Sequence, residues 1–180
     1  MQITAKQYGQ MMREQGILWP APALGRADLV SPAVRVHRIG RRSLESCLVV
    51  ERRGWGTVYC APGYGDYRAA FDAVMPRTSM GRDVDHLMPR SQAARRDFVA
   101  MGRISEASNR GWNDGDDAAA MAQKVRDTMV GNPHGFTSFL TDMERGWAVV
   151  TCYLRPMGEL DRGALSFVGP EEVRGALGAG

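Results

Sequence analysis

Two short polar segments of the chain carry the residue types that could do chemistry. An acid, an apolar residue, an acid and a histidine follow one another in Asp83–His86, and Asn109 stands in the second segment, which reads SNRG. Carboxylate and amide oxygens are ligands for hard divalent cations, and an imidazole accepts protons near neutral pH. A divalent cation beside a proton acceptor is what the hydrolysis of a phosphodiester requires.

Two strands and a helix would have to position these groups. In a short strand formed by the first segment, Val84 points to one face, the two acids point to the other, and His86 stands where the strand ends. The apolar segment Phe98–Ile104 predicts a second strand that pairs with the first. Ser108 or Asn109 can then cap the first turn of a following helix. This order of elements would bring a carboxylate, an imidazole and an amide together.

The string DVDHLMPRS followed by SNRG resembles the motif of HNH, or His-Me finger, nucleases, in which a β-hairpin and a helix surround one metal ion. The separation between His86 and Asn109, 109 − 86 = 23, is similar to that in the HNH domain of the CRISPR effector nucleases, where a DVDH element also precedes an NRG element. The segment also resembles a group of bacterial toxin-type nuclease domains. The resemblance covers Arg82 to Lys124, about a quarter of the chain.

The resemblance implies a role for each member of the site. His86 would be the general base that takes a proton from water, and Asp85 and Asn109 would hold one Mg²⁺ or Mn²⁺ ion. Asp83 would orient a ligand or support the hairpin. The family usually carries a middle asparagine on the return strand that holds the histidine's orientation. Ala100 stands in that neighbourhood here, so a backbone carbonyl would have to serve instead.

Arginine supplies almost all of the positive charge, since only Lys6 and Lys124 are lysines among 23 basic residues. The planar guanidinium suits phosphate oxygens. The arginines expected to bind nucleic acid lie in the motif, at Arg90, Arg95, Arg96, Arg103 and Arg110. A second group is interpreted either as a surface that tracks phosphates or as a solvated basic face: Arg35, Arg38, Arg41, Arg42, Arg52 and Arg53.

Length and composition bound the class of protein. With 180 residues, 44% of them hydrophobic, and a net charge of +3, the chain can bury one core. No apolar run approaches the length of a membrane span, and the first residues are not signal-like. We expect a cytoplasmic protein without membrane contact, and secretion or delivery by a route that needs no cleaved signal stays open.

The three cysteines, Cys47, Cys60 and Cys152, are far apart in the sequence. The first two lie in strand-like apolar runs. They are interpreted as small buried hydrophobic residues rather than as catalytic residues or disulfide partners. No CxxC pair occurs, which argues against a structural zinc site.

Hydrophobic patterning predicts an α+β fold, with a ββα-metal (His-Me finger) core and an N-terminal antiparallel sheet and helix extension, in a single compact domain. The extension would span residues 1–81 and the core 82–130, and residues 131–180 would pack on the same domain. Before the core, three antiparallel strands and a helix are expected at Val34–Ile39, Leu44–Val50, Trp55–Cys60 and Tyr67–Val74. Elsewhere we expect helices at Thr4–Gln15, Ala118–Met129 and Phe136–Glu144, a loop or extended arm at Ile17–Pro32, a strand at Trp147–Leu154, and a last short helix that starts at Gly169-Pro170 and frays into the terminal GALGAG.

Two further groups of polar residues have open interpretations. His37 falls on the polar face of its strand with the arginines, so it is predicted to be a surface or phosphate-contacting residue rather than a catalytic one. Asp116 and Asp117 would favour the helix dipole at the start of the following helix. The alternative for this acidic patch is that Asp114 or Asn113 supplies a further metal ligand.

The sequence therefore favours a metal-dependent endonuclease that acts on DNA, with RNA as a possible substrate. One alternative is a toxin-type nuclease effector, which would need a cognate inhibitor protein in the producing cell. Another is a nucleic-acid-binding protein whose HNH-like site has decayed. A structural protein with a chance motif is the alternative that predicts neither binding nor cleavage.

Overall fold

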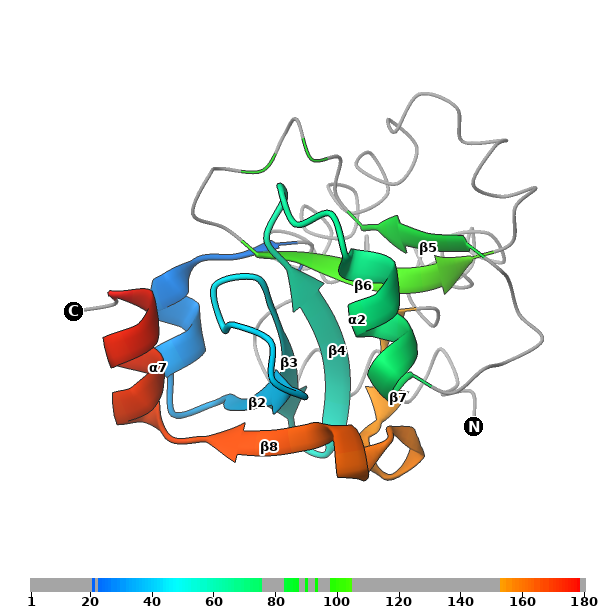
Figure 1. Cartoon of the computed structure of the whole chain (residues 1–180). Coiled ribbons are helices and arrows are strands. Elements are labelled where there is room, and N and C mark those ends of the chain that lie inside the picture. The colour runs from blue at the N-terminus through cyan, green and yellow to red at the C-terminus, as the bar shows by residue number, and fades with distance from the viewer. Residues whose placement is uncertain are drawn as a thin grey trace, which may run out of the picture.

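The computed structural model describes residues 21, 23–75, 83–87, 90, 93, 98–104 and 153–178. In these residues an eight-stranded antiparallel sheet is combined with two α-helices, so the predicted α+β class is confirmed (Figure 1). The strands are β1 (Ala23–Leu24), β2 (Arg35–Ile39), β3 (Cys47–Arg52), β4 (Trp55–Cys60), β5 (Asp83–His86), β6 (Phe98–Ile104), β7 (Arg155–Pro156) and β8 (Leu165–Val168). The α-helices are α2 (Tyr67–Val74) and α7 (Pro170–Leu177), and the 3-10 helices are η1 (Arg26–Val30), η3 (Met157–Glu159) and η4 (Arg162–Ala164).

The sheet is centred on the meander β2–β3–β4, which the sequence predicted. Its strand order is β1-β6-β4-β3-β2-β8, with β5 paired to β6 and β7 paired to β4. The β3–β4 hairpin closes through a two-residue loop, in which Arg53 has a φ of 49° and Gly54 a φ of 81°. Two left-handed residues in such a loop match the twist of the flanking strands. The central hairpin is thus specified by local sequence.

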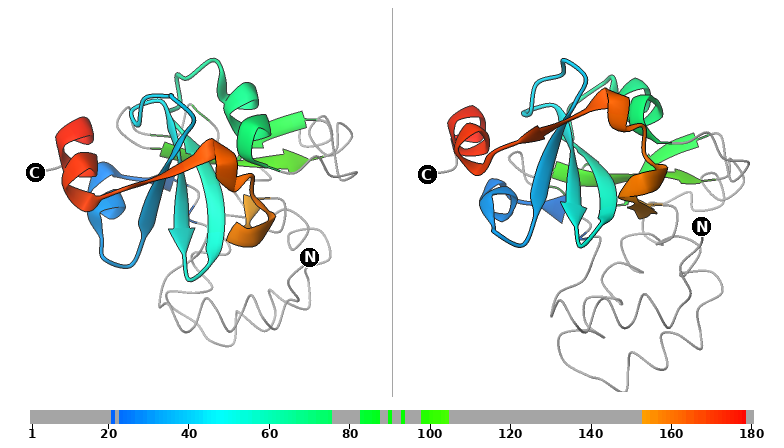
Figure 2. Two further views of the ribbon diagram at one scale, coloured as in Figure 1. Left: turned by 60° about the horizontal axis from the view of Figure 1, so that its bottom comes forward. Right: turned by 90° about the horizontal axis from the view of Figure 1, so that it is seen from below.

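Both faces of the sheet are buried. On β3, Leu48 and Val50 belong to one apolar cluster, and Cys47 and Val49 belong to the cluster on the opposite face. Helix α2 covers the face of Cys47 and Val49, and α7 with η1 contributes to the other face (Figures 1 and 2). Strands buried on both sides read as continuous apolar runs, which explains the sequence CLVV at the start of β3.

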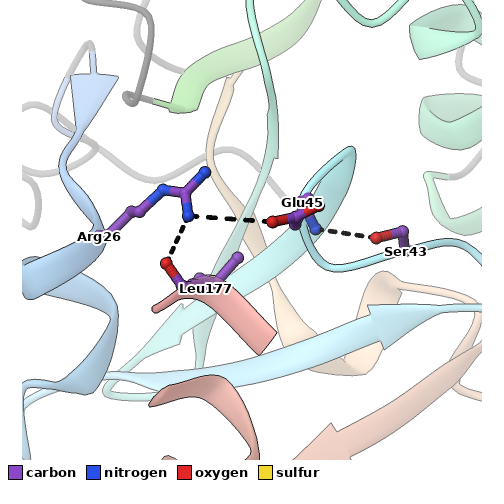
Figure 3. A network of polar contacts seen from close by, with 4 residues as sticks. All are labelled: Arg26, Ser43, Glu45 and Leu177. Carbon is purple, nitrogen blue, oxygen red and sulfur yellow. Dashed lines mark hydrogen bonds and ion pairs between the residues drawn. The ribbon is translucent and has the colours of Figure 1, made fainter. Parts of the chain in front are cut away.

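Arg26 ties the N-terminal part of the described chain to its C-terminal helix (Figure 3). Its guanidinium donates a hydrogen bond to the carbonyl of Leu177 in the last turn of α7, and it lies 3.9 Å from the carboxylate of Glu45. Ser43 in turn accepts the backbone N–H of Glu45 at 3.2 Å. A cation at a helix C-terminus satisfies a carbonyl that has no partner within the helix and interacts favourably with the helix dipole.

Several predicted boundaries need correction. Strand β3 begins at Cys47 rather than at Leu44, because residues 44–46 form a turn whose N–H groups bond back to Ser43. The segment Ile17–Pro32, predicted as a loop or extended arm, contains β1 and η1 in its described part. Tyr153 and Leu154, the described end of the strand predicted at Trp147–Leu154, lie outside any strand.

The C-terminal helix was predicted from Gly169-Pro170 and is confirmed, with proline in its first turn. The helix does not fray at its glycines but continues to Leu177, because Val173 and Leu177 are buried in the core. The predicted helix α2 also has the expected bounds, Tyr67–Val74. Strand β8, by contrast, had no counterpart among the predictions.

The remaining predicted elements cannot be compared. The helices expected at Thr4–Gln15, Ala118–Met129 and Phe136–Glu144 lie outside the described residues. In the described part of the chain, every helix is too short or too polar to cross a membrane.

Gly102 on β6 should be intolerant of a side chain. A Cβ atom there would lie 2.6 Å from the ring of Tyr153, which is fully buried. We expect Gly102→Ala to lower the free energy of unfolding by about 1–3 kcal/mol, measured by urea denaturation, because a packed ring cannot move away at no cost.

Gly63→Ala is the matched control, because a Cβ at Gly63 would meet nothing within 4 Å. Its free energy of unfolding should stay close to that of the wild type. Equal losses of stability in the two variants would show that the contact with Tyr153 is not what excludes a side chain.

Candidate active site

The segment DVDH forms β5 and pairs with β6, as the sequence predicted. Asp85 stands opposite Gly102, and His86 stands opposite Met101. Val84 is buried in the cluster that α2 covers, so the apolar residue of the segment faces the core as expected. The hairpin thus presents an acid and a histidine at the end of the sheet that lies opposite β8 (Figure 1).

The hydrogen-bond pattern of the hairpin fixes where the backbone of His86 points. The N–H of Leu87 donates to the carbonyl of Ala100 at 2.8 Å, which makes these two residues a hydrogen-bonded pair. Pairs alternate along an antiparallel ladder, so His86 and Met101 form a non-hydrogen-bonded pair. The N–H of His86 therefore points away from β6, and the carboxylate of Asp85 accepts it.

The imidazole of His86 is half-buried against α2. Its ring lies 4.8 Å from the ring of Tyr67, centroid to centroid, at an angle of 60°. Burial lowers the pKa of His86 to about 4, and the positive charge of Arg90 acts in the same direction. The buried Nε2 atom has no hydrogen-bond partner among the described residues. The ring is therefore neutral at physiological pH.

The carboxylate of Asp85 has a pKa above its usual value. Burial is the main cause, and the nearby negative charge of Asp83 adds to it, while the hydrogen bond from the N–H of His86 acts against both. No basic side chain among the described residues contributes an opposing effect on this pKa. A half-buried carboxylate without a neighbouring positive charge is a site where a cation would bind favourably.

The pleat of β5 places the carboxylate of Asp85 and the imidazole of His86 on opposite faces of the strand. Successive residues of a strand point to opposite faces. Asp85 shares a face with Asp83 and with Gly102, its cross-strand partner, and His86 shares the other face with Val84. The imidazole and the carboxylate can therefore act on one ligand only if that ligand crosses the end of the strand.

Ala100 occupies the position at which a middle asparagine was expected from the resemblance. Its side chain is fully buried in the cluster opposite α2, and its carbonyl accepts the hydrogen bond from Leu87. This carbonyl fixes the backbone immediately after His86. Asn109, the second predicted metal ligand, lies outside the described residues, as do Asn113 and Asp114.

The arginines of the motif differ in their surroundings. Arg90 is exposed and close enough to His86 to affect its pKa. Arg103 makes an ion pair with Asp72 and stacks over the ring of Phe71, with 5.4 Å between its guanidinium carbon and the ring centre. The guanidinium of Arg103 is thus already engaged within the fold. The other predicted nucleic-acid-binding residues, Arg95, Arg96 and Arg110, lie outside the described residues.

Three of the six arginines between residues 35 and 53 lie close to carboxylates. Arg38 lies 2.5 Å from the carboxylate of Glu172, and Arg42 lies 3.9 Å from that of Asp66. Arg35 lies 3.9 Å from the carboxylate of Glu51. These ion pairs favour a solvated, charge-balanced face over a surface that tracks phosphates.

The prediction of a surface position for His37 is wrong. The residue is only 6% exposed, because β8 pairs with β2 on the side opposite β3. Its Nε2 lies 2.6 Å from the carboxylate of Glu51, and its ring packs edge-on against Phe167. The predicted β3 strand stopped one residue short of Glu51, so this partner could not be recognised from the sequence pattern.

Side chains that could bind a metal ion are not clustered in the part of the chain that the structure describes. Among those residues, no group of three or more histidine, cysteine, aspartate or glutamate side chains could hold a metal ion. Comparisons of the chain with protein-family models, with curated proteins and with solved structures find no match.

The low pKa of His86 should make the protein less stable in acid. The unfolded chain binds a proton near pH 6.5, whereas folded His86 binds one only near pH 4. Its contribution to stability is therefore complete above pH 6.5 and is lost as the pH falls to about 4. We expect the free energy of unfolding of the wild type to decrease across this window, by up to about 3 kcal/mol from this residue.

His86→Gln removes the titrating group while leaving His37 and His134 in place. Urea denaturation of both proteins at intervals between pH 7 and 4 isolates the contribution of His86 as the difference between the two curves. Parallel curves would mean that His86 titrates in the folded protein as it does in the unfolded chain.

Proposed function

We propose that this chain is a metal-dependent endonuclease of the HNH type, which hydrolyses phosphodiester bonds of DNA. The state of the His86 imidazole is the observation that carries the proposal. Its imidazole is neutral above about pH 4, and its Nε2 has no hydrogen-bond partner among the described residues. A buried polar atom without a partner lowers stability, so its presence asks for a functional reason. His86 also lies in the segment that resembles a nuclease motif.

In this proposal His86 is the general base. A neutral imidazole takes a proton from water as the water oxygen attacks the phosphorus atom. The new P–O bond forms, the bond to the leaving oxygen breaks, and the proton resides on the imidazole. Tyr67 supports this role because its ring, 4.8 Å from that of His86, limits the directions in which the imidazole can turn.

Asp85 and Asn109 would hold the single Mg²⁺ or Mn²⁺ ion. Asp85 fits this role, since it is a half-buried carboxylate whose pKa is raised by burial and by Asp83. When bound, the cation supplies positive charge that stabilises the pentavalent phosphorus and the leaving oxygen. One carboxylate and one amide leave most positions around the ion open to water and phosphate oxygens.

The substrate would have to cross the end of β5. His86 and Asp85 point to opposite faces of this strand, and the N–H of His86 draws the Asp85 carboxylate to the outer edge. A phosphate at that edge can have a base on one side and a metal ligand on the other. Arg90, which is exposed and near His86, is the described residue that we propose as a phosphate contact. Arg95, Arg96 and Arg110 are proposed to act with it.

A nucleic-acid-binding protein with a decayed site is the second candidate. Ala100 favours it, because an alanine side chain cannot hold the imidazole of His86. The burial of Nε2 favours it too, because a base must reach the water that it deprotonates. This candidate predicts salt-sensitive binding to DNA without cleavage.

Plasmid nicking by the purified full chain tests the proposal. We expect nicking in Mg²⁺ or Mn²⁺ and none in EDTA. His86→Ala and Asp85→Asn should each lower the rate by about a hundredfold or more, because the first removes the base and the second weakens metal binding. Nicked and linear products on agarose gels give the rates.

Glu171→Gln is the control for the loss of one carboxylate, since the Glu171 side chain is 89% exposed and stands on α7, far in sequence from β5 and α2. It should nick at the wild-type rate. Far-UV circular dichroism of all variants separates lost chemistry from lost folding. A wild type that binds DNA yet cleaves neither DNA nor RNA in any divalent cation would overturn the proposal and support the decayed site.

The pH dependence of cleavage offers a second test. The base must be unprotonated, and the pKa of His86 is about 4. We therefore expect kcat/KM to fall only below about pH 5, well under the range of an exposed histidine. Initial rates measured from pH 4 to 8 would give the pH at which kcat/KM falls to half of its maximum. A value near 6.5 would contradict the assignment of His86 as the base.

A further inference from the structure

Cys47 and Cys60 face each other across the central hairpin. They are direct cross-strand partners in the register of β3 and β4, although twelve residues separate them in the sequence. Both are free thiols and both are fully buried in the cluster that α2 covers. Neither takes part in the proposed nuclease chemistry.

The ladder places the two residues at the closest kind of pair. The N–H of Ala61 donates to the carbonyl of Ser46 at 2.9 Å, so these two form a hydrogen-bonded pair. The adjacent pair, Cys47 with Cys60, is therefore non-hydrogen-bonded. Cα atoms in such pairs lie about 4.5 Å apart, within the range of about 4.4–6.8 Å found for disulfides. The backbone can thus accept a bond between the two sulfurs without moving.

The thiols are already in contact. The Cys60 thiol donates a hydrogen bond to the sulfur of Cys47, and this contact is the main cause that lowers the pKa of Cys47, with the positive charge of Arg42 assisting. The same hydrogen bond and burial raise the pKa of Cys60. Cys47 is therefore the better nucleophile of the pair.

One side chain connects this pair with the surface. Tyr64 packs against the cluster that contains both cysteines, and its hydroxyl makes a hydrogen bond with Cys47. Tyr64 is half-exposed and sits in a turn between Gly63 and Gly65. Its hydroxyl also donates a long hydrogen bond of 3.5 Å to Asp66, and the side chain of Arg42 is a further hydrogen-bond partner of Tyr64. A displacement of this ring would open a path to Cys47.

We propose that Cys47 and Cys60 are an oxidation site, a dithiol that closes to an intrachain disulfide on reaction with hydrogen peroxide. The sulfur of Cys47 attacks one peroxide oxygen, the O–O bond breaks, and a sulfenic acid and water form. The sulfur of Cys60 then displaces the hydroxyl group, which leaves as a second water. Overall, two thiols lose two electrons and two protons, and one peroxide becomes two waters.

The disulfide would join two strands covalently at the centre of the sheet. It would join β3 to β4, and Cys60 is also the partner of Val99 on β6, the strand that carries β5. A covalent link that closes a loop restricts the unfolded chain, so the oxidised protein should resist unfolding better than the reduced one. This inference holds whether or not the chain is a nuclease.

The test uses the full chain with Cys152→Ser, which removes the remaining thiol. After treatment of the folded protein with hydrogen peroxide, intact mass spectrometry should show the loss of two hydrogen atoms. A protease digest should contain one peptide that joins Cys47 to Cys60. The urea midpoint should be higher without dithiothreitol than with it.

Two sets of variants sharpen the test. With Cys47→Ala or Cys60→Ala in the same background, the mass loss and the shift of the midpoint should both disappear. Tyr64→Ala should form the disulfide several-fold faster than Tyr64→Phe, because only the first removes the ring that packs against the cluster containing Cys47. If the folded wild type and Tyr64→Ala both keep their thiols while the chain in urea forms the cross-link, the proposal is wrong. A disulfide that forms only in Tyr64→Ala would overturn it for the native chain.

Discussion

Burial of both faces of the sheet is the constraint on which the rest of the structure depends. Strand β4 shows it most clearly, because Tyr59 lies in one apolar cluster and Val58 in the other. Such a sheet needs a cover on each side, and the chain supplies α2 for one face and α7 with η1 for the other. The link between Arg26 and Leu177 closes the second cover by joining segments from opposite ends of the described chain (Figure 3).

The position of the candidate site is set by β6, the strand with which β5 pairs. This strand pairs with β4 on one side and with β1 and β5 on the other. Near its end, Gly102 leaves room for the ring of Tyr153, so an aromatic side chain packs on the face that Asp85 shares with Gly102. The raised pKa of Asp85 and the lowered pKa of His86 have this common origin: both side chains are attached to a strand whose two faces are packed. Burial favours the neutral form of an acid and of a base alike.

Local pairings could be predicted from the sequence, and distant ones could not. The β5–β6 hairpin, the meander β2–β3–β4 and helix α2 follow from periodicity and turn residues within short windows. Strand β8 returns to β2 from the far end of the chain, and its sequence LSFV carries no turn or alternation signal that marks a partner. That pairing is what buries His37 and explains why a residue placed on a polar face lies inside. The pairing of Cys47 with Cys60, by contrast, is local: the two-residue loop of Arg53 and Gly54 fixes the register of the hairpin that joins them.

The pleat also limits what the DVDH segment can do, in a way that residue types alone do not show. Residues that are neighbours in the sequence suggest side chains that are neighbours in space, yet successive residues of a strand, such as Asp85 and His86, point to opposite faces. Their cooperation requires a ligand that crosses the end of the strand at His86, and beyond that residue the pairing with β6 extends only to the hydrogen bond from Leu87 to the carbonyl of Ala100 among the described residues. Ala100 thus contributes through its backbone, at the point where the resemblance led us to expect an asparagine side chain. The orientation of the imidazole is instead limited by Tyr67, a residue of α2 that lies outside the motif. The side chain that packs against the imidazole thus comes from the helix that covers the sheet and not from the strand that pairs with β5.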